Sequence, residues 1–196
     1  MSINVYLNKA LDKVNQNDFE TSIELFTKVL KLDPSHKDAY YHRGVSYLNL
    51  EKIDLAIFDF NKLIELDPNY AFYYSCRGFA KSRLGDKKGA IEDYFKSLEL
   101  EPDNEITLNN LGLVQEELGY MEQAKKSFEK SDAIRKNENY QPETFGEPSQ
   151  HPKKLKIDEK QNTQSKSQLA KEIFTKKSTF KEFLSFIKNG FKLKDH

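Results

Sequence analysis

The stretch from Tyr40 to Pro68, YYHRGVSYLNLEKIDLAIFDFNKLIELDP, decides the fold of this chain. It holds two runs of apolar residues at helical spacing, separated by a polar break at residues 51–52 and closed by an Asp-Pro pair. A proline pushes the residue before it out of the helical region, so the second helix should end there. Pro34, Pro68 and Pro102 follow one another at a constant interval. A fixed period of this length indicates a stack of repeated helix pairs.

Small residues return at one position in each first helix and at another in each second helix. Those of the first helices are Ala10, Gly44, Gly78 and Gly112; those of the second are Ser22, Ala56, Ala90 and Ala124, followed four residues later by the aromatic residues Phe26, Phe60, Tyr94 and Phe128. Glycine inside a helix costs about 1 kcal/mol relative to alanine, so its return at one position needs a reason. Close approach of two helices supplies that reason, because a larger side chain would overpack the crossing.

In this order and at this period, the residues resemble those of the tetratricopeptide-repeat family, whose units are helix–turn–helix pairs of about 34 residues. The resemblance implies an all-α solenoid with four units, at residues 3–36, 37–70, 71–104 and 105–138. The departures are local: the first unit has Ala10 and Ser22 where the motif prefers Gly and Ala, and the fourth has Lys136 where a proline would stand.

The resemblance also implies a concave groove lined by first-helix residues that the internal crossing does not use. These residues are Asn4, Leu7, Asn8 and Leu11; Tyr41, His42, Val45 and Asn49; Phe72, Ser75, Cys76, Phe79 and Arg83; and Asn109, Asn110, Leu113 and Glu117. Amides in such a groove can pair with the backbone of an extended peptide. We predict that Tyr41, Phe72 and Phe79 anchor the partner, since aromatic residues dominate binding energetics. The alternative is that these side chains pack against neighbouring first helices.

Some members of the family hold the terminal carboxylates of heat-shock chaperones with a clamp of Lys, Asn and Arg residues. The matching positions here hold Leu7, Leu11, His42, Phe72 and Cys76. None of these supplies the charge that the clamp needs. The sequence therefore predicts a protein or peptide partner, but not a carboxylate-clamp chaperone.

The net charge of zero is unevenly distributed. Residues 141–196 contain 12 Lys and 7 acidic residues, a net charge of +5, so the preceding residues carry −5. Binding to phosphate backbones needs clustered Lys and Arg, and the repeats are acidic. We therefore expect no nucleic-acid partner.

Catalytic and metal-binding residues do not form a recognisable group. The four histidines are not paired at ligand spacing, and Cys76 is the single cysteine. A Cys76–His42 pair is conceivable, because both occupy the same position of adjacent units, but structural roles are the simpler interpretation. We expect no enzyme activity, no metal and no cofactor.

Three absences in the sequence suggest where the protein works. One cysteine allows no intrachain disulfide, the first residues show no signal peptide, and no apolar run approaches the length of a membrane-spanning helix. We therefore expect a soluble, cytoplasmic protein.

The stack should end with a helix over residues 121–136. Lys125 and Asp132 replace the apolar residues that the earlier units carry at the same positions, as suits the wetter outer face of a terminal repeat. Residues 139–166 are rich in Pro, Gln, Asn and Ser, and we predict a disordered linker there.

Residues 167–196 form a basic tail with a predicted amphipathic helix. A capping box at Thr179 and Glu182 precedes its apolar face, which consists of Phe180, Phe183, Leu184, Ile187 and Phe191. This helix could fold back onto the repeats, bind another protein, or lie on an anionic membrane surface. We predict a non-enzymatic interaction module whose groove binds a partner segment and whose tail helix regulates or extends that binding. The alternative is a membrane-surface adaptor anchored by the tail helix.

Overall fold

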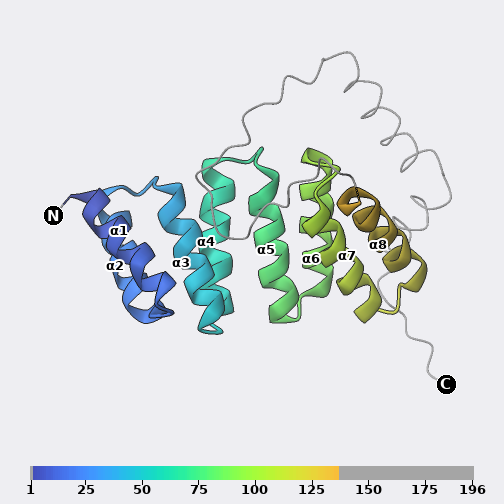
Figure 1. Ribbon diagram of the computed structural model, residues 1–196, viewed down its shortest axis with the longest axis horizontal. Coiled ribbons are helices and arrows are strands. Elements are labelled where there is room, and N and C mark those ends of the chain that lie inside the picture. The colour runs from blue at the N-terminus through green and yellow to red at the C-terminus, as the bar shows by residue number, and fades with distance from the viewer. Residues whose placement is uncertain (1, 137–196) are drawn as a thin grey trace, which may run out of the picture. The chain divides into compact units, whose positions relative to one another are not determined.

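The computed structural model describes residues 2–136, which form eight α-helices and no strand. The helices are α1 (Ile3–Asn15), α2 (Phe19–Leu32), α3 (Lys37–Asn49), α4 (Ile53–Leu66), α5 (Ala71–Leu84), α6 (Lys87–Leu100), α7 (Glu105–Glu117) and α8 (Met121–Arg135). Each helix packs against the next one along the chain, and the pairs follow one another from α1/α2 to α7/α8 (Figure 1). The expected all-α solenoid of helix–turn–helix pairs is therefore confirmed for these residues.

One left-handed residue connects the two helices of each pair. The four residues are Asn17, Glu51, Gly85 and Gly119, with φ angles of 58°, 56°, 93° and 80°. Glycine adopts this conformation without a steric penalty, and asparagine is the side chain that tolerates it best. Glu51 is neither, so the turn of the second pair carries backbone strain that the other three turns avoid.

The recurrent glycines lie under the recurrent aromatic rings. A Cβ atom at Gly44 would lie 2.9 Å from Cε1 of Phe60, and one at Gly78 would lie 2.9 Å from Cε1 of Tyr94. At Gly78 the backbone oxygen of Ala90 would also be only 3.2 Å away. The aromatic ring therefore excludes a side chain at both glycines, and at Gly78 the backbone of the partner helix does so as well, whereas the spacing pointed to the approach of the two backbones.

A buried ion pair joins the two helices of the second pair, and its arginine also reaches the first pair. Arg43 on α3 donates to both carboxylate oxygens of Asp59 on α4, with N–O distances of 2.6 and 2.8 Å, and the Asp59 side chain is fully buried. The remaining Nη1 of Arg43 donates to Thr27 Oγ1 on α2, at 3.1 Å. The planar guanidinium of Arg43 thus donates to a carboxylate in its own helix pair and to a hydroxyl group in the preceding helix pair.

The third helix pair has the same arrangement at the equivalent positions. Arg77 donates to both oxygens of Asp93 at 2.6 and 2.8 Å and to Asn61 Oδ1 on α4 at 2.8 Å. Lys81 Nζ approaches Asp93 at 2.9 Å and adds a second positive charge. Because each arginine reaches back to the preceding pair, these contacts favour one packing register between neighbouring pairs.

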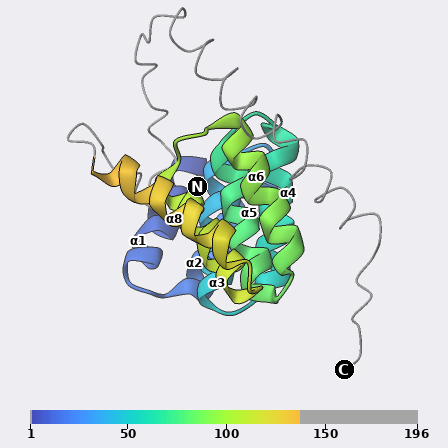
Figure 2. The ribbon, with the colours of Figure 1, turned by 90° about the vertical axis from the view of Figure 1, so that its right-hand side faces the viewer.

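The last described helix, α8, lies at the end of the stack (Figure 2) and carries exposed charged side chains. The side chains of Lys125 and Asp132 are 71% and 56% exposed. Exposure of charged residues at these positions agrees with a wet end to the stack. The predicted linker, tail and tail helix lie outside the described residues, so those assignments stay predictions.

Candidate functional site

The predicted groove residues lie on the first helices α1, α3, α5 and α7, and we call their surface the first-helix face. Its members differ in exposure. The exposed ones are Asn4, Asn8, Asn49, Arg83, Leu113 and Glu117; the half-buried ones are Leu7, Leu11, His42, Val45, Phe72, Phe79, Asn109 and Asn110; and the buried ones are Tyr41, Ser75 and Cys76. A residue can anchor a partner only if the partner can reach it. Tyr41, Ser75 and Cys76 are buried and therefore do not contribute to the surface of this face.

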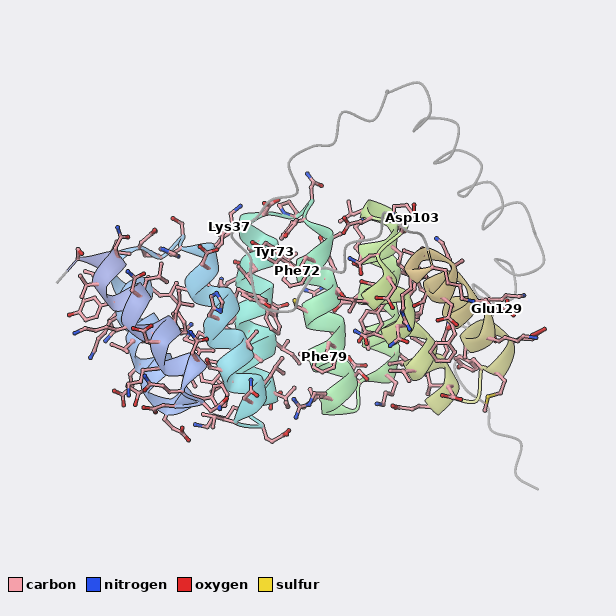
Figure 3. The ribbon with its side chains drawn as sticks, in the orientation of Figure 1. Lys37, Phe72, Tyr73, Phe79, Asp103 and Glu129 are labelled. Carbon is pink, nitrogen blue, oxygen red and sulfur yellow. The ribbon has the colours of Figure 1, made fainter. Side chains whose placement is uncertain are left out.

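Two phenylalanines of α5 form the apolar part of this face. Phe72 and Phe79 are both half-buried and pack against the core cluster that lies between the second and third helix pairs. They are seven residues apart, which places them on one side of the helix about two turns from each other. Figure 3 shows Phe72 at the start of α5 and Phe79 further along it. Val45 of α3 packs against the same cluster.

Tyr41 supports Phe72 from below the surface. Its side chain is 1% exposed, and its ring centroid lies 5.4 Å from that of Phe72. Tyr70 and Tyr73 also contact Phe72, with centroid distances of 5.9 and 6.4 Å. The predicted anchor Tyr41 is therefore a core residue in this structure, and its role is to hold Phe72 in place.

His42 is half-buried between aromatic rings. It stacks on Phe26 with a centroid distance of 5.7 Å and an interplanar angle of 11°, and it meets Tyr41 edge-on at 5.0 Å. Burial lowers the pKa of His42 to about 4, against a weaker opposing effect of Asp38. At neutral pH the imidazole is therefore uncharged, and this part of the face presents a neutral aromatic surface.

Two polar members of the face are engaged within the protein. Arg83 donates to the backbone oxygen of Leu48 at 3.2 Å and forms an ion pair with Glu51. Asn49 Nδ2 donates to the backbone oxygen of Val45 at 2.9 Å. The side chain of Arg83 therefore ties α5 to the end of α3, and its charge is already partnered.

The described part of the chain shows no grouping suited to metal chemistry. Residues 2–136 contain no cluster of three or more His, Cys, Asp or Glu side chains placed to hold an ion. Cys76 is 2% exposed and belongs to the same core cluster as Tyr41. No helix within these residues is long and apolar enough to cross a membrane.

Two family models described as tetratricopeptide repeat match this chain. One covers residues 7–71 and the other covers residues 77–104 and 107–138, which together make up more than half of the sequence. The chain belongs to the tetratricopeptide-repeat family. No curated protein sequence matches it.

Solved tetratricopeptide-repeat structures superpose on this one. A crystal structure of MamA has a TM-score of 0.65 at 25% identity and covers 68% of this chain and 78% of its own. MamA from Desulfovibrio magneticus RS-1 has a TM-score of 0.66 at 22% identity, covering 71% and 78%. The structure of the first TPR of Spaghetti (RPAP3), bound to the HSP90 peptide SRMEEVD, has a TM-score of 0.57 at 30% identity and covers 60% of this chain and 93% of its own.

The sequence did not predict the tyrosines that support Phe72 of the first-helix face. Tyr70 and Tyr73 meet edge to face, with a centroid distance of 4.7 Å and an interplanar angle of 86°, and complete the aromatic group around Phe72. Tyr70 immediately precedes α5 and Tyr73 is the third residue of that helix. The repeat pattern has no characteristic residue at either position. Their neighbours in sequence could have suggested an aromatic group, because Tyr70, Phe72 and Tyr73 fall within four residues.

Proposed function

We propose that this tetratricopeptide-repeat chain is a non-enzymatic interaction module that binds an apolar segment of another protein on its first-helix face. The family match and the structural neighbours support a protein-interaction module. The choice of face and of partner chemistry goes beyond that support and depends on the side chains described above.

A single observation carries the proposal: Phe72 and Phe79 are partly exposed on one side of α5, and both pack against the core beneath them. Phe72 contacts Tyr41, Tyr70 and Tyr73, so its ring is fixed before a partner arrives. A preorganised aromatic ring loses little conformational entropy on binding, which is a property of binding hot spots. Val45 and Leu113 extend the apolar surface on α3 and α7.

The partner should be apolar, and it should not depend on an acidic terminus. The peptide bound to Spaghetti, SRMEEVD, contains three acidic residues. In this chain, the positions matching the carboxylate clamp hold apolar or neutral side chains, and Arg83 is paired with Glu51. An acidic peptide would therefore lose hydration here without gaining an ionic partner.

The experiment is photo-crosslinking of the full-length chain, with p-benzoylphenylalanine in place of Phe79, in lysate of the source cells. We expect cross-linked partners that disappear when Phe72→Ala is added. Phe95→Ala is the matched control, because Phe95 is 41% exposed on the second helix α6 and lies outside the first-helix face. Cross-links that persist in a folded Phe72→Ala variant, or that Phe95→Ala removes equally, would contradict this choice of face.

Residues 137–196 lie outside the described residues, so the effect of the tail helix on partner binding stays a prediction. Deletion of residues 167–196 in the same cross-linking experiment tests it. A tail that regulates or extends binding should change the yield of partner cross-links, and an unchanged yield would argue against both roles.

A further inference from the structure

An exposed apolar patch lies on α4, the second helix of the second repeat. Leu55 and Phe58 are 47% and 53% exposed, and Leu66 at the end of the helix is 38% exposed. These three residues are called the α4 patch below. Leu55 and Phe58 are three residues apart, so their side chains are neighbours on the helix surface. Because the α4 patch lies on a second helix, it is separate from the first-helix face.

The repeat fold does not require apolar side chains at these positions. In the other repeats the residues equivalent to Leu55 are Thr21, Gly89 and Gln123, and those equivalent to Phe58 are Glu24, Glu92 and Lys126. Three repeats thus fold with polar or small residues at both positions. Stacking does not explain Leu55 and Phe58, and two adjacent exposed apolar side chains in one repeat indicate a contact with another surface.

The charges along α4 are balanced around the patch. Three of the charged residues between positions 51 and 67 form ion pairs with the helices that pack against α4, namely Glu51 with Arg83, Asp59 with Arg43, and Asp67 with Lys37. The other four are Lys52, Asp54, Lys62 and Glu65, two of each sign. The patch therefore does not select a strongly acidic or a strongly basic partner.

The order of these residues is complementary to itself. Asp54, Phe58, Lys62 and Leu66 are spaced four residues apart and form one ridge along α4. Two helices that cross at about −50° align ridges of this kind. If a second copy of α4 runs antiparallel to the first, Asp54 of each copy lies beside Lys62 of the other, and the two Phe58 rings meet between them.

The two remaining charges fit the same arrangement. Lys52 and Glu65 lie at nearly equal distances from Phe58 along the chain, in opposite directions, so an antiparallel pair brings each close to the opposite charge. Lys62 Nζ lies 5.8 Å from the Phe58 ring centroid and 2.6 Å from Glu65 Oε2. An exposed pair within one helix contributes little to stability, so it does not prevent Lys62 from also pairing with Asp54 of a second copy.

The other second helices do not have this order. Their equivalent residues are Glu20, Glu24 and Lys28 on α2; Lys88, Glu92 and Lys96 on α6; and Glu122, Lys126 and Lys130 on α8. The central residue of each set is charged, so an antiparallel pair would place it against the same charge of the second copy. Self-association through a second helix is therefore expected at α4.

We propose that the α4 patch binds the α4 patch of a second copy of this chain, with the two helices antiparallel about a two-fold axis near Phe58. Such a contact uses the same surface on both copies. One pair of helices buries less than the roughly 1,200 Å² of a standard interface, so the dimer should be weak and depend on concentration. The proposal is independent of the first-helix face, which stays open on both copies.

Sedimentation equilibrium of the purified full-length chain over a wide range of concentrations tests the dimer. We expect the average mass to rise from that of the monomer toward that of the dimer. Phe58→Glu copies α2 and α6, so it should fold, and it should raise the dissociation constant by about tenfold or more. Phe72→Ala on the first-helix face and Phe95→Ala on α6 should leave the constant unchanged, and circular dichroism checks the fold of each variant.

Charge reversal tests the antiparallel order. Asp54→Lys and Lys62→Glu should each weaken the dimer, because each places like charges side by side across the two-fold axis. The double variant with both changes restores opposite charges and should associate more strongly than either single variant. A double variant no stronger than the single variants would exclude the antiparallel order.

Three further outcomes would overturn the proposal. The chain could stay monomeric at every concentration, or the folded Phe58→Glu variant could associate as strongly as the wild type. The third concerns the occupant of the patch. With p-benzoylphenylalanine in place of Phe58, we expect cross-links between α4 of two copies, with a yield that falls on dilution. Cross-links within one copy, with a yield that dilution does not change, would assign the patch to another segment of the same chain.

Discussion

The two inner repeats and the two terminal repeats use the same fold with different polar cores. Each inner repeat contains a buried arginine–carboxylate pair that also reaches the preceding repeat, namely Arg43–Asp59 and Arg77–Asp93. At the same positions the first repeat has Lys9 and Leu25, and the fourth has Leu111 and Ser127. A repeat unit therefore does not need the pair in order to fold, and what the arginine adds beyond its own repeat is the hydrogen bond to the preceding one.

The fourth repeat uses other polar contacts. Ser127 donates to Gln115 Oε1 at 2.8 Å, and Glu105 pairs with Arg135. These contacts join α7 to α8 within one repeat. In the inner repeats the arginine also joins the two helices of its own repeat, but its Nη1 reaches the preceding repeat, and a wrong register there would leave that N–H without its acceptor. In the first repeat no earlier repeat is present in the described chain to receive such an arginine.

The largest expected effect is the loss of one member of an inner pair. Asp59→Ala should lower the free energy of unfolding by about 3–5 kcal/mol, because it leaves the Arg43 charge half-buried without its carboxylate. Burial raises the pKa of Asp59, and the Arg43 guanidinium opposes this shift. Urea denaturation followed by circular dichroism measures the change.

A double variant separates charge from packing at this site. Arg43→Leu with Asp59→Ser copies Leu111 and Ser127 of the fourth repeat and should recover at least half of the stability that Asp59→Ala loses. If the double variant is as unstable as Asp59→Ala, the inner repeats depend on the pair itself, and the comparison with the fourth repeat fails.

A smaller effect concerns His42 and acid. The pKa of His42 is about 4 in the folded protein, below its ordinary value of 6.5, so the unfolded chain binds the proton first as pH falls. Stability is complete above pH 6.5 and declines toward pH 4, by about 2 kcal/mol at pH 5. His42→Asn copies Asn8 and Asn110 of the terminal repeats. Urea midpoints at pH 7.5 and 5 should differ less in this variant than in the wild type, and equal differences would show that His42 is not the group responsible.

The smallest effect concerns the turn of the second repeat. Glu51 has φ of 56° where the third and fourth repeats have glycine, so Glu51→Gly should relieve backbone strain. The gain should be about 0.5 kcal/mol, because the greater freedom of glycine in the unfolded chain and the lost Arg83 pair offset part of it. Gly85→Ala is the matched reverse change and should destabilise by about 1 kcal/mol. A thermal melt that shows Glu51→Gly to be destabilising would mean that the Arg83 pair outweighs the strain.

Much of the fold was predictable from the sequence because its signals are local and periodic. Pro34, Pro68 and Pro102 gave the period, and Gly44 and Gly78 marked the crossings before their contacts with Phe60 and Tyr94 were known. The exposure of residues on the first-helix face was harder to predict. Tyr41 has the register of a surface residue but is buried beneath Phe72, since the exposure of a first-helix residue depends on how closely the next repeat packs.

The sequence by itself determined the all-α repeat architecture, the position of each helix and the polar outer face of α8. These follow from spacing and from side-chain polarity, which act over a few residues. Only the tertiary structure decided that Arg43 and Arg77 link neighbouring repeats, that Tyr41 and Cys76 are core residues, and that Leu55 and Phe58 stay exposed. Each of these depends on contacts between helices that are far apart in the chain, and a one-dimensional pattern does not specify the distances between them.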